Sequence, residues 1–144
     1  MKRIFVVNTG SNSTKVAFFE DENIIFKKEL QVPEAELKKS LSAMDQLKFR
    51  TNVTLECIEE EGVELSTLDI IAARGGMLPA IEGGAYIVND FMIDVVKKAP
   101  ATLHESSLAC VIARLLPDPY KIPTIIYDGV TLDEMDPITH FEHP

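Results

Sequence analysis

The sequence has only two cysteines, Cys57 and Cys110, and they lack the spacing of a cysteine-based metal site. They lie far apart in the chain, and both fall among apolar neighbours. Isolated cysteines of this kind are usually buried free thiols in proteins from a reducing compartment. We therefore expect two free thiols and no disulfide.

Long apolar runs are also absent. The run from Ile4 to Val7 follows two basic residues, as in a signal peptide, but it is too short and breaks at Asn8. No other segment is long enough to span a bilayer. These features predict a cytoplasmic chain with no membrane partner.

Positive charge is scarce, since 14 lysines and arginines face 23 aspartates and glutamates, which gives a net charge of −9. A chain this acidic repels phosphate backbones, which argues against a nucleic-acid partner. The 144 residues fit one domain, and no repeat, low-complexity tract or linker divides them. The hydrophobic fraction of 46% is that of a globular protein.

The apolar runs that are present have the length of strands. We expect strands at residues 4–7, 16–20, 24–30, 68–73 and 123–127. The stretch 81–88 contains Gly83 and Gly84 and indicates a loop or a short hairpin.

Helices are expected between these strands. Pro33 opens a long helical stretch, in one bent piece or two, with Leu37, Leu41, Met44 and Leu47 on one face. Gly62 ends it, and further helices are predicted at 89–98, capped by Asn89, and at 105–116. The order of elements predicts an α/β domain whose mixed five-stranded sheet combines an antiparallel three-stranded meander with parallel strands, flanked by helices.

The loop between the first two strands carries small polar residues and a lysine. Its glycine-containing turn around Gly10 can present backbone N–H groups to an anion, while Ser11, Ser13 and Lys15 add hydroxyls and charge. Asn8 offers an oxygen of the type that Mg²⁺ accepts. The loop matches neither a Walker A motif nor a dinucleotide fingerprint, so its residues alone favour a plain hairpin turn over phosphate binding.

Three further candidates stand near strand or helix ends. Arg74 follows a strand and can hold a carboxylate or phosphate, or be an ordinary surface arginine. His104 begins a helix, where it is either catalytic or solvated, and no nucleophile elbow accompanies it. Asp128 follows the last strand, as a Mg²⁺ ligand, a base or a turn residue.

Taken together, these motifs resemble one family. The spacing Asn8-x-Gly10-Ser11-x-Ser13-x-Lys15 is similar to the N-terminal signature of the acetate and butyrate kinase family, and Arg74-Gly75-Gly76 resembles the butyrate kinase form. The stretches 79–89, 104–109 and 128–135 resemble further family segments, in the same order along the chain. The resemblance implies a ribonuclease-H-like N-terminal domain of a kinase, in agreement with the strand order above.

The resemblance also implies a reaction and roles for these residues. The reaction is reversible phosphoryl transfer between ATP and a short-chain carboxylate such as butanoate, giving ADP and an acyl phosphate, with Mg²⁺. By position, Asn8, Gly10, Ser11, Ser13 and Lys15 would lie beside the transferred phosphate, and Asn8 also beside the metal. His104 would stabilise the phosphoryl group, Asp128 would organise Mg²⁺ or the nucleophile, and Arg74 would neighbour the carboxylate.

The sequence departs from the family's motifs at two positions. Gly129 stands where the family has proline, and Ser107 stands where it has asparagine. We expect residues 1–144 to be a single N-terminal kinase domain without the family's C-terminal domain, inactive alone. The alternative is a non-catalytic binding module, and the expected partners are the missing domain or another copy of the chain.

Overall fold

The computed structural model describes residues 1–76, 82–98, 104–116 and 121–127. Its centre is a six-stranded sheet in the order β3-β2-β1-β4-β6-β5. The strands are β1 (Arg3–Thr9), β2 (Ser13–Glu20), β3 (Asn23–Gln31), β4 (Ile70–Arg74), β5 (Ala85–Ile87) and β6 (Thr124–Tyr127). The helices are α1 (Glu34–Lys39), α2 (Leu47–Glu60), α3 (Asp90–Lys98) and α4 (Leu108–Leu115), with 3₁₀ turns η1 (Ala43–Gln46), η2 (Leu65–Thr67) and η3 (Glu105–Ser107).

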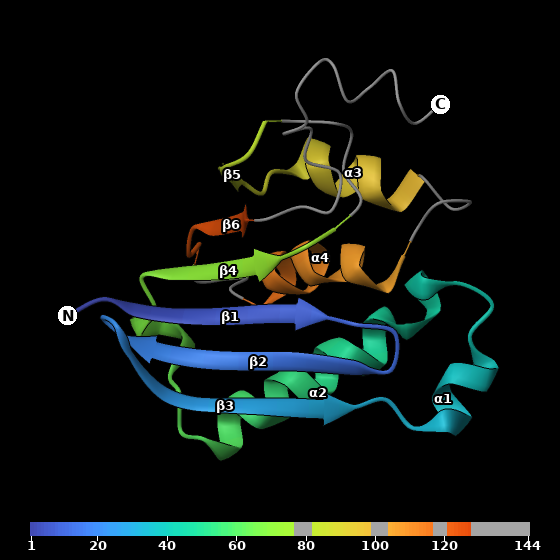
Figure 1. Cartoon of the computed structure of the whole chain (residues 1–144), viewed down its shortest axis with the longest axis horizontal. Helices are drawn as coiled ribbons and strands as arrows, with labels where there is room; N and C mark the ends of the chain where they lie inside the picture. The colour runs from blue at the N-terminus through green and yellow to red at the C-terminus, as the bar shows by residue number, and fades with distance from the viewer. Residues whose placement is uncertain (77–81, 99–103, 117–120, 128–144) are drawn as a thin grey trace, which may run out of the picture.

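The sheet has the predicted mixed topology. Strands β1, β2 and β3 form the antiparallel meander, while β4 pairs parallel with β1 and β6 pairs parallel with β4. Helices α2 and α4 both lie behind the sheet in Figure 1, with α4 against β1, β4 and β6, and α2 against β2. Parallel strands end at the same edge, so the polar residues that follow β1 and β4 are brought together there.

The core lies between the sheet and the two helices on that face. Side chains alternate along β1: Phe5 and Val7 point into the core and are fully buried, whereas Ile4 and Val6 lie on the opposite face and are half-buried. The apolar run of β1 is therefore that of a central strand, as the sequence predicts.

The sheet contains one strand more than predicted. Strand β5 pairs antiparallel with β6 at the edge of the sheet, in the stretch where the sequence indicates a loop or short hairpin. Only three residues pair, and of these Tyr86 is half-buried while Ala85 and Ile87 are exposed. Three residues form no apolar pattern long enough to predict a strand.

The helical stretch that follows Pro33 is interrupted. Helix α1 ends at Lys39 because Ser40 takes an extended conformation, and a capping box between Ser42 and Asp45 starts the turn that leads into α2. The predicted helix face is therefore wrong at Leu41, which is 98% exposed. Gly62, with a φ of 66°, lies just past the end of α2, as predicted. None of the described helices has both the length and the hydropathy needed to cross a lipid bilayer.

Both cysteines are buried free thiols, as predicted. Burial raises the pKa of Cys110 to about 11, against an ordinary value of 9.0. Burial also raises the pKa of Cys57, although the nearby ammonium of Lys28 opposes that shift. Because the thiolate is the reactive form, both side chains are chemically protected in the folded protein.

At pH 8 we expect both thiols of the folded protein to react with a disulfide reagent at least about a hundredfold more slowly than in the urea-unfolded chain.

The raised pKa values of the thiols also predict that the stability of the protein depends on pH. Above the usual thiol pKa the unfolded chain loses protons that the folded chain keeps, so the free energy of unfolding falls between about pH 9 and pH 11. Urea unfolding at several pH values measures this fall. The fall in the free energy of unfolding should be smaller in Cys110→Ala. The same fall in that variant as in the wild-type chain would contradict the raised pKa of Cys110.

Candidate active site

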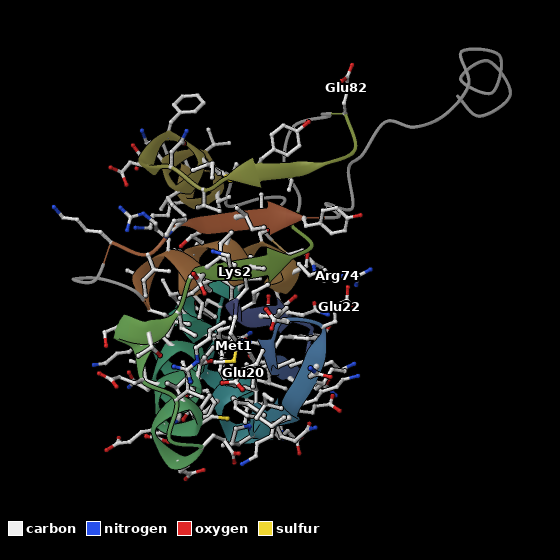
Figure 2. The ribbon with its side chains drawn as sticks, turned by 90° about the vertical axis from the view of Figure 1, so that its left-hand side faces the viewer. Met1, Lys2, Glu20, Glu22, Arg74 and Glu82 are labelled. Atoms are coloured by element: carbon white, nitrogen blue, oxygen red, sulfur yellow. The ribbon has the colours of Figure 1, made fainter. Side chains whose placement is uncertain are left out.

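Four of the residues at the strand ends form a row across the sheet. Lys15 of β2 pairs with Asn8 of β1, Asn8 pairs with Arg74 of β4, and Arg74 pairs with Tyr127 of β6. Residues that pair directly across neighbouring strands point to the same face. Figure 2 shows Arg74 extending from the sheet on the side away from α2. The structure thus brings three of the predicted site residues, Lys15, Asn8 and Arg74, to one edge and one face.

The loop between β1 and β2 is held in place by backbone hydrogen bonds. The N–H of Gly10 donates to the carbonyl of Ser13 at 2.8 Å, and the carbonyl of Asn12 accepts from the N–H of Val32 at 2.8 Å. Ser11 and Asn12 at its tip are exposed. Within the described ranges, the N–H groups of these two residues have no hydrogen-bond acceptor. The loop therefore offers two adjacent backbone donors to the solvent.

Arg50 of α2 lies behind this loop, and its guanidinium donates to the loop's carbonyl oxygens. It is 0% exposed. The carbonyls of Gly10, Ser11 and Ser13 accept from it at 2.8, 3.0 and 2.8 Å. Arg50 was not among the predicted site residues, although a signal exists: one helical face, which the structure buries, consists of Ala43, Gln46, Arg50, Thr54 and Cys57. Polar residues at core positions are rarely buried without partners.

The two side chains that follow the loop have different environments. Ser13 is buried, and its hydroxyl donates to the Glu29 carboxylate at 2.7 Å, so this hydroxyl is turned toward β3 rather than held at the tip of the loop. Lys15 is exposed, and in the described part of the chain no carboxylate lies within ion-pair distance of its ammonium. Lys15 is thus an available cation beside the loop.

The segment that begins at His104 lies next to the ends of β1 and β4. The hydroxyl of Thr9 donates to the carbonyl of Glu105 at 2.6 Å. A Cβ at Gly76 would meet Ser107 at 3.6 Å, and Gly76 has a φ of 122°, which favours glycine. The strand ends and this segment are therefore packed together by short polar and backbone contacts.

His104 itself is oriented by its neighbour. Its Nδ1 accepts from the N–H of Ser106 at 3.1 Å, and its side chain is 51% exposed. A neutral imidazole that accepts at Nδ1 carries its proton on Nε2. Nε2 lies 3.7 Å from a Glu105 carboxylate oxygen, beyond hydrogen-bond distance, so it remains able to donate to a ligand.

No protein-family model matches the chain. A probable butyrate kinase from Thermotoga petrophila is 43% identical to it over 135 residues, which cover 94% of this chain and 38% of that protein. Butyrate kinase 1 from Clostridium acetobutylicum is 36% identical over 139 residues, 96% of this chain and 39% of that protein. This chain is a relative of the butyrate kinases. The resemblance to the butyrate kinases is confirmed, and the chain spans about two fifths of the length of these relatives.

The fold of this butyrate kinase relative also occurs in solved acyl kinases. The acetate kinase from Porphyromonas gingivalis superposes with a TM-score of 0.56 at 15% identity, over 89% of this chain and 37% of that chain. At that identity the likeness concerns the fold alone. Together with the strand order it confirms the predicted α/β, ribonuclease-H-like fold class.

The predicted metal site has only one of its two ligands within the described residues. Asn8 is half-buried at the end of β1, and Asp128 lies outside the described ranges. Those ranges contain no cluster of three histidine, cysteine or acidic side chains able to hold a metal ion. A single amide oxygen is not a metal site, although Mg²⁺ in kinases is held mostly by substrate phosphates and water.

Proposed function

We propose that this chain forms one wall of the active site of a butyrate-kinase-type enzyme, which transfers phosphate between ATP and butanoate or another short-chain carboxylate. The reaction is supported by the relatives, which are named as butyrate kinases. ATP and ADP are the proposed nucleotides, and Mg²⁺ is proposed only as the ion that accompanies their phosphates. The observation that carries the proposal is that an available cation and two free backbone donors lie at the β1–β2 loop, while the segment that begins at His104 packs against the ends of β1 and β4.

Each of these groups suits the charge of a phosphoryl group. The N–H groups of Ser11 and Asn12 and the ammonium of Lys15 are donors for phosphate oxygens. Nε2 of His104 is a further donor, able to stabilise negative charge that develops during transfer. Asn8 lies between Lys15 and Arg74 in the row, and Arg74 is proposed to face the carboxylate end of the acid. In this proposal Ser13 acts through its backbone, because its hydroxyl is bonded to Glu29.

Phosphoryl transfer needs positioned charges more than it needs a strong base. A carboxylic acid is already ionised at neutral pH, so it can attack phosphorus without losing a proton first. A single wall does not exclude water from the reacting groups, so we expect the isolated chain to be silent.

The test is a chimaera in which this chain replaces the matching 139 residues of Butyrate kinase 1 from Clostridium acetobutylicum. Purified chimaera is incubated with ATP, Mg²⁺ and butyrate, and the acyl phosphate is trapped as a hydroxamate. We expect butyrate- and ATP-dependent product from the chimaera and none from the isolated chain. A folded chimaera without activity would contradict the proposed function.

A further inference from the structure

All the N–H groups of the Arg50 guanidinium are engaged in the interior. Nε and Nη2 donate to the side-chain oxygen of Gln46 at 3.0 and 2.8 Å. Nη1 donates to the Ser13 carbonyl and to the hydroxyl of Thr14, and Nη2 also donates to the carbonyls of Gly10 and Ser11. One side chain thus fixes three carbonyl oxygens of a loop only a few residues long.

These bonds determine where the loop's N–H groups point. In a trans peptide the carbonyl oxygen and the following N–H point in opposite directions. The Gly10 and Ser11 carbonyls are directed at Arg50, so the N–H groups of Ser11 and Asn12 are directed away from it, toward solvent. These are the two backbone donors that have no acceptor in the described ranges.

The same guanidinium places a positive charge directly behind those donors. Burial lowers the pKa of Arg50, and the nearby carboxylate of Glu105 works against that shift. Arginine nevertheless stays charged in proteins. Among the described residues no carboxylate lies within ion-pair distance of the guanidinium, and its side-chain partners, Gln46 and Thr14, are neutral. No ion pair within the described residues therefore neutralises the charge, although the Glu105 carboxylate acts on it from a greater distance, and the low dielectric around the guanidinium strengthens its effect at the loop.

We propose that Arg50 is a positioning residue for the phosphate-binding loop, which aims the Ser11 and Asn12 amides at the phosphate and adds positive potential behind them. Arg50 does not touch the ligand. This inference rests on the proposed function, in which this loop holds the transferred phosphate.

The experiment is a titration of the ¹⁵N-labelled 144-residue chain with inorganic phosphate, followed through the amide signals of Ser11 and Asn12. Two variants test Arg50. Arg50→Lys replaces the planar fork by a single ammonium, which cannot hold three carbonyls in fixed geometry. Gln46→Glu keeps the acceptor for Arg50 but places a carboxylate beside it, so it removes the excess charge while keeping the bonds. Thr54→Val is the control, since Thr54 is equally buried one turn further along α2 and its hydroxyl donates to the Arg50 backbone carbonyl rather than to the loop.

We expect phosphate to shift the Ser11 and Asn12 amide signals in the wild-type chain and in Thr54→Val with the same affinity. Arg50→Lys and Gln46→Glu should bind phosphate at least about tenfold more weakly, with unchanged signals from β1 and β4. If Arg50→Lys does not fold, Gln46→Glu alone decides. Wild-type affinity in either folded variant, or no phosphate shift at Ser11 and Asn12 in the wild-type chain, would overturn the inference.

The phosphate titration and the chimaera assay test this inference and the proposed function separately. An inactive chimaera, together with phosphate binding that depends on Arg50, would remove the kinase assignment and leave this inference intact. An active chimaera with no phosphate response at Ser11 and Asn12 would remove this inference alone.

Discussion

Replacing Lys15 by alanine in the chimaera is expected to lower kcat for butyryl phosphate formation by at least about a hundredfold. Lys15 lies beside the loop, opposite Asn8, and no described carboxylate neutralises it. Charge is redistributed over the equatorial and leaving oxygens in the loose transition state, so we expect a cation fixed at this point to lower the barrier more than it tightens the binding of ATP. Steady-state kinetics with the hydroxamate assay measure the two effects separately.

The matched control is Lys27→Ala. Lys27 is an exposed lysine on β3 and lines the same shallow surface groove as Lys15, but it pairs with Ala17 rather than with a residue of the strand-end row. Its loss removes the same charge from the same neighbourhood, and kcat should change by less than about twofold. Equal losses in the two variants would mean that Lys15 acts only through the general surface field, which would contradict its proposed place at the phosphate.

Phe5→Ala is expected to lower the free energy of unfolding by about 3–5 kcal/mol. Phe5 is fully buried in β1, which lies between β2 and β4, and its ring packs edge-on against Phe26 with 6.5 Å between centroids. Removing it leaves a cavity between the sheet and the helices that cover it. Since whole domains are stable by only about 5–15 kcal/mol, this one change should remove a large share of the total. Urea unfolding of the 144-residue chain measures the difference.

Phe91→Ala is the matched control, because it deletes the same atoms from a side chain that is 77% exposed on α3. Its effect should stay within about 0.5 kcal/mol. A loss of stability at Phe5 no greater than at Phe91 would mean that the sheet does not pack on α2 and α4 as described.

Most of the fold could be predicted because several strands contain short apolar runs and its helices carry local end signals. Asn89 accepts from the N–H of Met92 at 2.9 Å, as an N-cap does, and Gly62 follows the end of α2. Strand β5 could not be predicted, since it depends on pairing with β6 rather than on a pattern of its own. The sequence left one bent helix or two open, and it did not place the break after Lys39 because Leu37, Leu41 and Met44 have helical spacing by chance.

The candidate site was predicted in part, and the missing part has a physical reason. Residues that follow strands can be read from the sequence, and Asn8, Lys15 and Arg74 do meet in one row. Arg50 comes from a helix more than thirty residues along the chain from the loop, and its contacts are to carbonyl oxygens, which have no sequence signature. The bond between Ser13 and Glu29 likewise depends on the register of β2 and β3.

A crystal structure of the chimaera with a non-hydrolysable ATP analogue tests the account most directly. We expect oxygens of the terminal phosphate within about 3.2 Å of the Ser11 and Asn12 amides and of the Lys15 ammonium, with Arg50 still bonded to the carbonyls behind the loop. A nucleotide whose phosphates lie away from an empty β1–β2 loop would contradict it.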